Sequence, residues 1–227
     1  MTTLIIATRN PHKVGEIRDI LGDGFEYRTL SDHPGAPTAV EDGSTFAENA
    51  VKKAESLAAW LRGSVESGKR KAEGGKDETF VLADDSGLEV DALNGAPGVH
   101  SARFAALDAP TAGNSKDADN NAKLLRLLRD VPVTDRTARF RCVIALVPVT
   151  QHSSPLTPHV FDGACEGHIE FAPRGQGGFG YDPLFIPEGF DRSFAELGDA
   201  EKNRISHRSR ALAKLREWLE AQRSVIA

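Results

Sequence analysis

The chain has 227 residues, with 28 basic and 33 acidic side chains, so its formal net charge is −5. Hydrophobic residues make up 40% and charged residues 27%, which excludes a disordered or collagen-like chain. This length can bury a substantial core without metal or disulfide staples, so we expect a single domain over residues 1–227, built as one body or as two lobes around one core. The net acidity argues against binding of nucleic acid through its phosphate backbone.

The cysteines and the N-terminus bear on the compartment. Cys142 and Cys165 lie in apolar, strand-like stretches, which favours buried free thiols. The N-terminus lacks the basic region and longer apolar run of a signal peptide, and no stretch approaches the roughly 20 apolar residues that span a bilayer. We therefore expect a cytoplasmic protein that does not bind a membrane.

The first 60 residues predict a strand and two helices. An apolar run at residues 4–7 predicts a strand, and Asn10 and Pro11 suit the N-cap and first turn of a helix. A second helix is predicted from residue 44 or 45, where Thr45 and Glu48 have capping-box spacing before a stripe of alanine and leucine.

The middle of the chain predicts an excursion followed by a strand. Residues 63–79 are mostly small or charged and predict an exposed, mobile insertion. The apolar run 80–83 predicts a buried strand, which we expect to stop at the turn-forming residues Asp84-Asp85-Ser86-Gly87.

The second half of the chain predicts two further helices and two strands. A helix is predicted over residues 116–129, a sheet strand over 137–147, and a strand over 160–171 that pairs with it across the turn 153–158. Ser206 suits the N-cap of a C-terminal helix. Mixed helices and strands around one extended sheet indicate the α/β class, and no internal repeat is visible.

Two polar groups follow predicted strands. Thr8-Arg9-Asn10-Pro11-His12-Lys13 leads into the first helix, whose unpaired N–H groups suit a phosphate; alternatively Asn10 only caps the helix and Lys13 is solvated. Asp84-Asp85-Ser86-Gly87 suits a hard cation such as Mg²⁺ held by carboxylate and phosphate oxygens; alternatively it is a turn. Neighbouring side chains of an extended segment face opposite ways, so the two aspartates are not equivalent. Glu41-Asp42-Gly43 is a second acidic turn with the same ambiguity.

Two further groups lie near the C-terminus. Gly175 to Pro183 fits G-x-G-x-x-G, but Tyr-Asp-Pro follows where a dinucleotide fold needs a helix, so we reject that interpretation. Phe179 and Tyr181 could stack on a nucleobase or instead fill the core. Lys202 and Ser206-His207-Arg208 suit a phosphate or a purine carbonyl, or simply cap a helix.

Taken in order, five blocks resemble the inosine triphosphate pyrophosphatase family, also called XTP/dITP diphosphatases. They are ATRNPHK, EDGSTFAENAVKKA, LADDSGLEVDALNGAPGVHSARFA, GGFGYDPLF and EKNRISHRSRAL, spread from residue 7 to residue 212. The resemblance implies an elongated, two-lobed α/β fold around a long mixed sheet with flanking helices, a homodimer, and a purine nucleotide in the cleft between the lobes. It also implies hydrolysis of ITP, dITP and XTP to the monophosphate and pyrophosphate with Mg²⁺, for which Mn²⁺ can substitute.

The same resemblance assigns roles residue by residue. Asp85 becomes the metal-linked catalytic acid or base with Asp84 beside it, and Glu41 is assigned as the second metal ligand, with Asp42 as the alternative. The substrate contacts are Thr8, Arg9, Asn10, Pro11, His12, Lys13, Ser86, Phe179, Gly180, Tyr181, Asp182, Lys202, His207 and Arg208. Among these, His207 and Arg208 would read the oxygenated purine edge. The family often has glycine where Arg9 stands, and its excursion after Leu61 is shorter.

Two other functions were weighed against catalysis. A non-catalytic nucleotide sensor could use the same cleft, but paired acids and a Mg²⁺-suited turn favour hydrolysis. RNA binding is disfavoured, because the single Arg174-Gly175 step in an acidic chain is far from a repeated RGG tract.

Overall fold

The computed structural model describes residues 1–66, 78–108, 113–149 and 157–226. The strands are β1 (Thr3–Ile6), β2 (Glu26–Thr29), β3 (Thr79–Val90), β4 (Thr137–Pro148), β5 (His159–Ile169) and β6 (Phe185–Pro187). The α-helices are α1 (Pro11–Leu21), α2 (Phe46–Glu66), α3 (Asp117–Leu128), α4 (Phe194–Leu197), α5 (Asp199–Ile205) and α6 (His207–Ile226). Short 3₁₀ turns are η1 (Leu30–Asp32), η2 (Asp91–Leu93), η3 (Gly98–Arg103), η4 (Ala105–Asp108) and η5 (Val133–Asp135).

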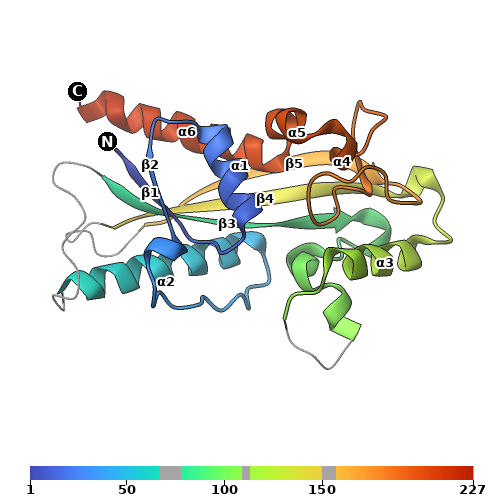
Figure 1. Cartoon of the computed structure of the whole chain (residues 1–227), viewed down its shortest axis with the longest axis horizontal. Helices are drawn as coiled ribbons and strands as arrows, with labels where there is room; N and C mark the ends of the chain where they lie inside the picture. Colours follow the sequence, from blue (N-terminus) through green and yellow to red (C-terminus); the bar gives the residue numbers. More distant parts are fainter. Residues whose placement is uncertain (67–77, 109–112, 150–156, 227) are drawn as a thin grey trace. The chain divides into compact units, whose positions relative to one another are not determined.

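The strands form a mixed sheet in the order β2-β1-β3-β4-β5-β6 (Figure 1). β1 pairs in parallel with both β2 and β3, whereas β5 and β6 are antiparallel. The α/β class, with helices flanking a mixed sheet, is therefore confirmed. Contacts divide the chain into two compact units: unit 1 comprises residues 1–85, 143–162 and 211–227, and unit 2 comprises 86–142 and 163–210.

Unit 1 is organised by the two faces of β3. Phe80 meets Trp218 of α6 edge to face, with ring centroids 6.2 Å apart, so even-numbered positions face that helix. Odd-numbered Val81 and Ala83 are fully buried on the opposite face, the side of α2, whose Ala50, Ala54, Leu57 and Leu61 are also buried. In Figure 1, α2 and α6 accordingly lie on opposite sides of the strands of this unit.

Unit 2 has its own core. Phe140 of β4 lies at its centre, with ring centroids 4.8 Å from Phe185 and 6.0 Å from Phe194. The surrounding buried residues include Leu88, Val90, Phe104, Leu124, Leu128, Cys165, Ile169, Tyr181 and Leu184. Helix α3 and the loop before β6 are thereby fixed against the sheet.

Most of the predicted elements are confirmed. Helix α1 begins after Asn10, whose side chain accepts hydrogen bonds from the N–H groups of His12 and Lys13 at 2.9 and 3.3 Å. The predicted helix at 116–129 and the paired strands at 137–147 and 160–171 appear as α3, β4 and β5. Ser206 precedes α6 and its hydroxyl accepts the N–H of Ser209 at 3.2 Å. Both cysteines are buried free thiols, as predicted.

The bounds of two predicted segments were wrong. The strand expected to stop at Asp84 continues to Val90, because helices α1 and α2 supply lysines that pair with the carboxylates of Asp84 and Asp85. The excursion expected from Gly63 begins later, since α2 runs to Glu66; one helical glycine costs only about 1 kcal/mol relative to alanine. The excursion also ends before Thr79, the first residue of β3. Its remaining residues 67–77, like most of the predicted turn 153–158, lie outside the described residues.

None of the helices in the described part of the chain combines the length and apolar composition that crossing a bilayer demands.

Candidate active site

The loop before α1 is held in place by its own side chains. The Thr8 hydroxyl accepts the N–H of Asn10 at 3.2 Å, and Arg9 donates to the Thr38 hydroxyl at 2.9 Å. Asn10 does cap the helix, but Lys13 is not simply solvated, because its ammonium pairs with the carboxylate of Asp84. The first turn of α1 thus presents a fixed positive charge beside a buried acid.

Asp84 and Asp85 point to opposite faces of β3, as the extended backbone predicted. The Asp84 side chain is fully buried and pairs with Lys13 of α1. The Asp85 side chain is 10% exposed, and its Oδ1 accepts from the ammonium of Lys53 of α2 at 2.9 Å. Each carboxylate therefore has its own lysine, supplied by a different helix.

Lys53 joins three acceptors and was not singled out from the sequence. Its ammonium donates to the backbone carbonyl of Asp84 at 2.8 Å and to Asp85, and lies 3.6 Å from the Glu41 carboxylate. The signal was present in the helical spacing: Asn49 and Lys53 are four residues apart, on the edge of the buried stripe of α2. Asn49 also contacts Asp85, with its amide donating to Oδ2 at 3.2 Å.

The surroundings of Asp85 set its protonation behaviour. Burial raises the pKa of this carboxyl above its usual range, while the positive charges of Lys53 and Lys13 partly offset the effect. A carboxylate with a raised pKa, held by fixed donors, is a better proton acceptor than an ordinary aspartate.

The carboxylates of Glu41 and Asp85 are also suitable ligands for a divalent cation. Glu41 and Asp85 converge on one ammonium, so two carboxylates already face a common positive charge. Two carboxylates together with phosphate oxygens are the donors that Mg²⁺ prefers. Among the described residues, no group of three or more His, Cys, Asp or Glu side chains is gathered for a metal, and water or phosphate oxygens would supply the remaining ligands of a bound cation.

Unit 2 assembles a second set of predicted residues. Arg208, only 1% exposed, donates to the hydroxyl of Ser86 at 2.9 Å, which joins positions 122 residues apart. His207 is buried and stacks on Phe140, with ring centroids 4.9 Å apart. These donors are therefore fixed by packing rather than left mobile on the surface.

Lys202 and Asp182 form a buried ion pair. The Lys202 ammonium lies 2.6 Å from Asp182 Oδ2, and both side chains are at most 3% exposed. The same carboxylate oxygen accepts the N–H of Phe179 at 2.9 Å, and the ammonium lies 4.3 Å from the centre of the Phe179 ring. Gly178 allows this close approach, because a Cβ there would lie 2.2 Å from Asp182 Oδ2. Asp182 and Lys202 thus shape the loop that carries Phe179.

Tyr181 and Gly180 of the same loop are anchored as well. The Tyr181 ring is buried and its hydroxyl donates to the Ser101 carbonyl at 2.9 Å, so this side chain fills the core. Gly180 donates its N–H to Asp117 at 2.7 Å and accepts from Asn121 at 3.0 Å. Helix α3 therefore holds the loop at two points, which no local pattern predicted. A turn and β6, not a helix, follow Gly180.

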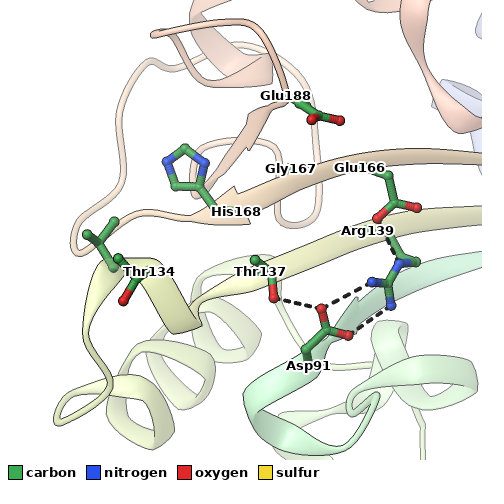
Figure 2. A pocket seen from close by; sticks show the side chains of 9 residues that line it. Asp91, Thr134, Thr137, Arg139, Glu166, Gly167, His168 and Glu188 are labelled. Atoms are coloured by element: carbon green, nitrogen blue, oxygen red, sulfur yellow. Dashed lines mark hydrogen bonds and ion pairs between the residues drawn. The ribbon is translucent and has the colours of Figure 1, made fainter.

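A separate pocket of about 590 Å³ lies in unit 2, and none of the predicted site residues lines it (Figure 2). Arg139 lines it, with guanidinium nitrogens 2.9 and 3.1 Å from the Asp91 carboxylate and 2.8 Å from Glu166. The hydrogen bonds from Arg139, and then from Thr137, hold the pKa of Asp91 below its usual range. This ion-pair network ties η2, β4 and β5 together.

Taken together, the sheet order, the capped loop before α1 and the carboxylate–lysine pairs on β3 define an α/β protein with acidic and basic side chains gathered around β3. The chain matches the Ham1 family over residues 4–218. It is 45% identical over 221 residues to a dITP/XTP pyrophosphatase of Geobacillus kaustophilus, covering 97% of this chain and 95% of that protein. The chain belongs to the Ham1 family.

Solved structures with a similar fold also belong to this family or carry the same activity in their titles. A HAM1 protein from Coxiella burnetii superposes with a TM-score of 0.76 at 36% identity, covering 97% of this chain and all of that one. A crystal structure titled nucleoside-triphosphatase / dITP/XTP pyrophosphatase from Mycobacterium abscessus gives 0.66 at 39% identity, covering 94% and 98%.

Proposed function

We propose that this protein is a nucleoside triphosphate pyrophosphatase that hydrolyses the deaminated purine nucleotides dITP, ITP and XTP to the monophosphate and pyrophosphate. The observation that carries the proposal is the pair of carboxylates on β3, Asp84 and Asp85, each joined to its own lysine. The names of the related proteins, dITP/XTP pyrophosphatases, support the substrate class.

Glu41 and Asp85 would hold Mg²⁺, or Mn²⁺ in its place, together with oxygens of the triphosphate. When bound, the cation neutralises phosphate charge and makes the phosphorus more electrophilic. Asp85 orients the attacking water at the α-phosphorus and accepts its proton, with Asp84 beside it, as the raised pKa of Asp85 favours. The bond from the α-phosphorus to the bridging oxygen breaks, and pyrophosphate leaves with its charge stabilised by Lys13.

The loop of Thr8 to Lys13 would bind the phosphates through the side chains of Thr8, Arg9 and Lys13 and the positive end of the α1 dipole, because the N–H groups of His12 and Lys13 already bond to Asn10. Arg9, Pro11 and His12 line this loop, whereas the Asn10 side chain keeps its capping role.

Base selection is assigned to unit 2. Hypoxanthine and xanthine carry a carbonyl at C6 where adenine carries an amine, so the donors of His207 and Arg208 would face another donor if ATP entered. Arg208 is buried and fixed by Ser86, so it cannot turn away. Such a mismatch costs a factor of about 10⁴ in specificity. Phe179 would stack on the base, with Gly180, Tyr181, Asp182 and Lys202 maintaining the loop.

Pyrophosphate release from ITP, dITP, XTP, ATP and GTP in the presence of Mg²⁺ tests this function. We expect kcat/KM for the deaminated purines to exceed that for ATP by at least about 10³. Tight binding of ITP without pyrophosphate release would instead indicate a nucleotide sensor.

The proposal includes a homodimer, which the family resemblance implies, and a location in the cytoplasm, which the sequence features favour. Light scattering of the purified protein tests the dimer, and a mass of one chain would contradict it.

A further inference from the structure

Asn49 lies in the first turns of α2 with only 1% of its surface exposed, and both ends of its amide are used. Its Nδ2 donates to Asp85 Oδ2 at 3.2 Å, and its Oδ1 accepts the backbone N–H of Gly43 at 2.8 Å. A single side chain therefore links the strand that carries Asp85 to the turn that carries Glu41.

The absence of a Cβ at Gly43 makes this contact possible. A Cβ at position 43 would lie 2.7 Å from Asn49 Oδ1 and 2.8 Å from the Cβ of Glu48, closer than real Cβ atoms approach other groups. Only glycine brings the backbone N–H so near the amide, so Gly43 and Asn49 form one arrangement.

Helix capping does not account for Asn49. The N–H of Glu48 is taken by the Thr45 hydroxyl at 3.1 Å, and the Glu48 carboxylate accepts the N–H of Ser44 at 2.7 Å. The cap of α2 is complete without Asn49. A buried amide costs free energy unless it is hydrogen-bonded, and here both bonds lead to the acidic residues of the site.

The contacts of Asp85 divide its two oxygens. Lys53 occupies a position on Oδ1 and Asn49 a position on Oδ2. An ionised carboxylate has about four lone-pair positions, so each oxygen keeps one for a cation or water while the group is prevented from rotating.

We propose that Asn49 is a positioning residue, which fixes the carboxylate of Asp85 relative to the Glu41 turn so that the two acids can share one divalent cation. The inference rests on the proposed function. Outer partners of metal-binding carboxylates typically contribute 10- to 100-fold to metal affinity or activity, which sets the expected effect.

The first measurement is the binding of Mn²⁺ to the metal-free protein without nucleotide, monitored through the electron paramagnetic resonance signal of free Mn²⁺. Asn49→Ala should raise the Kd for Mn²⁺ by at least about tenfold. The matched control is Asn120→Ala in unit 2, because Asn120 is 3% exposed and also uses both ends of its amide, accepting from Ala105 at 2.8 Å and donating to Ala102 at 3.4 Å. The control should lower the Tm but leave the Kd for Mn²⁺ unchanged.

The second measurement is pyrophosphate release from ITP. Asn49→Ala should lower kcat at least about tenfold with KM for ITP changed less than about twofold, since no phosphate or base contact is removed. If Asn49→Ala does not fold, Gly43→Ala provides the test, because it keeps the Asn49 side chain and displaces the shared hydrogen bond together with the contact to Glu48.

The double variant tests whether Gly43 and Asn49 act together. Its loss of Mn²⁺ affinity should be smaller than the product of the two single losses, whereas independent losses would overturn the linkage.

The outcomes separate the inference from the function. A folded Asn49→Ala protein with unchanged Kd for Mn²⁺ and unchanged kcat would overturn the positioning role while the activity of the wild-type protein stands. A wild-type protein that releases no pyrophosphate but loses Mn²⁺ affinity on Asn49→Ala would refute the proposed function and support the positioning role.

Discussion

Replacing Asp85 by asparagine removes one negative charge while preserving the size of the side chain. Burial, the largest influence on Asp85, raises the pKa of its carboxyl, so the charged form is less stable in the fold than in water. Loss of the charge by itself therefore does not destabilise the protein. Asparagine can still accept from Asn49 through its carbonyl oxygen, but its amide NH₂ group then faces Lys53, which keeps the Asp84 carbonyl at 2.8 Å and Glu41 at 3.6 Å.

These opposing effects give a small change in stability. A lost hydrogen bond to a charged group costs about 1.5–3 kcal/mol, and relief of a buried charge offsets most of it. We expect a net change within about 1 kcal/mol, or about 2–4 °C in Tm for a chain of this size. The expected loss of kcat is at least about 10²-fold, equivalent to about 2.7 kcal/mol in the activation free energy.

The assay is the initial rate of pyrophosphate release from saturating ITP and Mg²⁺, paired with a thermal melt. Asp162→Asn is the control, since Asp162 is exposed and pairs with Lys214 at 2.7 Å on the surface, and it should keep full kcat. Near-full turnover by Asp85→Asn, or inactivity explained by unfolding alone, would refute the assignment and move the catalytic role to Asp84 or Glu41.

Three further results are expected. Excess EDTA should abolish pyrophosphate release and added Mg²⁺ or Mn²⁺ should restore it, whereas undiminished turnover in chelator would exclude the cation. Arg139→Gln should lower stability by up to about 1 kcal/mol at neutral pH, because the pairs are partly exposed. The pKa of Asp91 is lower in the folded protein, so its pairing with Arg139 stabilises the fold above the unfolded pKa of 3.8, and this stability is lost as pH falls through the folded pKa. The free energies of unfolding of the wild-type protein and Arg139→Gln, measured in urea, should therefore converge at acid pH. A difference between them that is constant with pH would contradict this. Arg136→Met should lower the free energy of unfolding by about 3 kcal/mol. The buried Arg136 side chain donates to the carbonyls of Val131 and Glu170 at 3.0 Å and to that of Leu128, and methionine leaves these carbonyls without their donor. A change below about 0.5 kcal/mol would show that other groups replace Arg136.

Local signals predicted the elements that depend on their own residues. Asn10 before Pro11 and Ser206 before His207 carry their capping chemistry in the sequence, and α1 and α6 begin where those signals lie. The alternation after Thr137 likewise identified β4, because the side-chain period of a strand is visible without knowledge of its partners.

Contacts from distant residues account for what the sequence did not reveal. Asp84-Asp85-Ser86-Gly87 is typical of a turn, yet lysines 71 and 32 residues away stabilise it as strand. Strands β2 and β6 are four and three residues long, too short for a periodic pattern. The roles of Lys53 and Asn49 depend on how α2 is rotated against β3, which follows from packing rather than from local sequence.

The division of the chain into two units also affects how it folds. Unit 1 is built from three separate stretches, residues 1–85, 143–162 and 211–227, and unit 2 from two, 86–142 and 163–210. A fragment ending at Asp85 lacks Trp218, which packs on Phe80, so no single cut releases unit 1 whole. Pairings between stretches that are distant in the sequence form slowly, so we expect the N-terminal stretch of unit 1 to gain its full stability only when residues 211–227 pack on it.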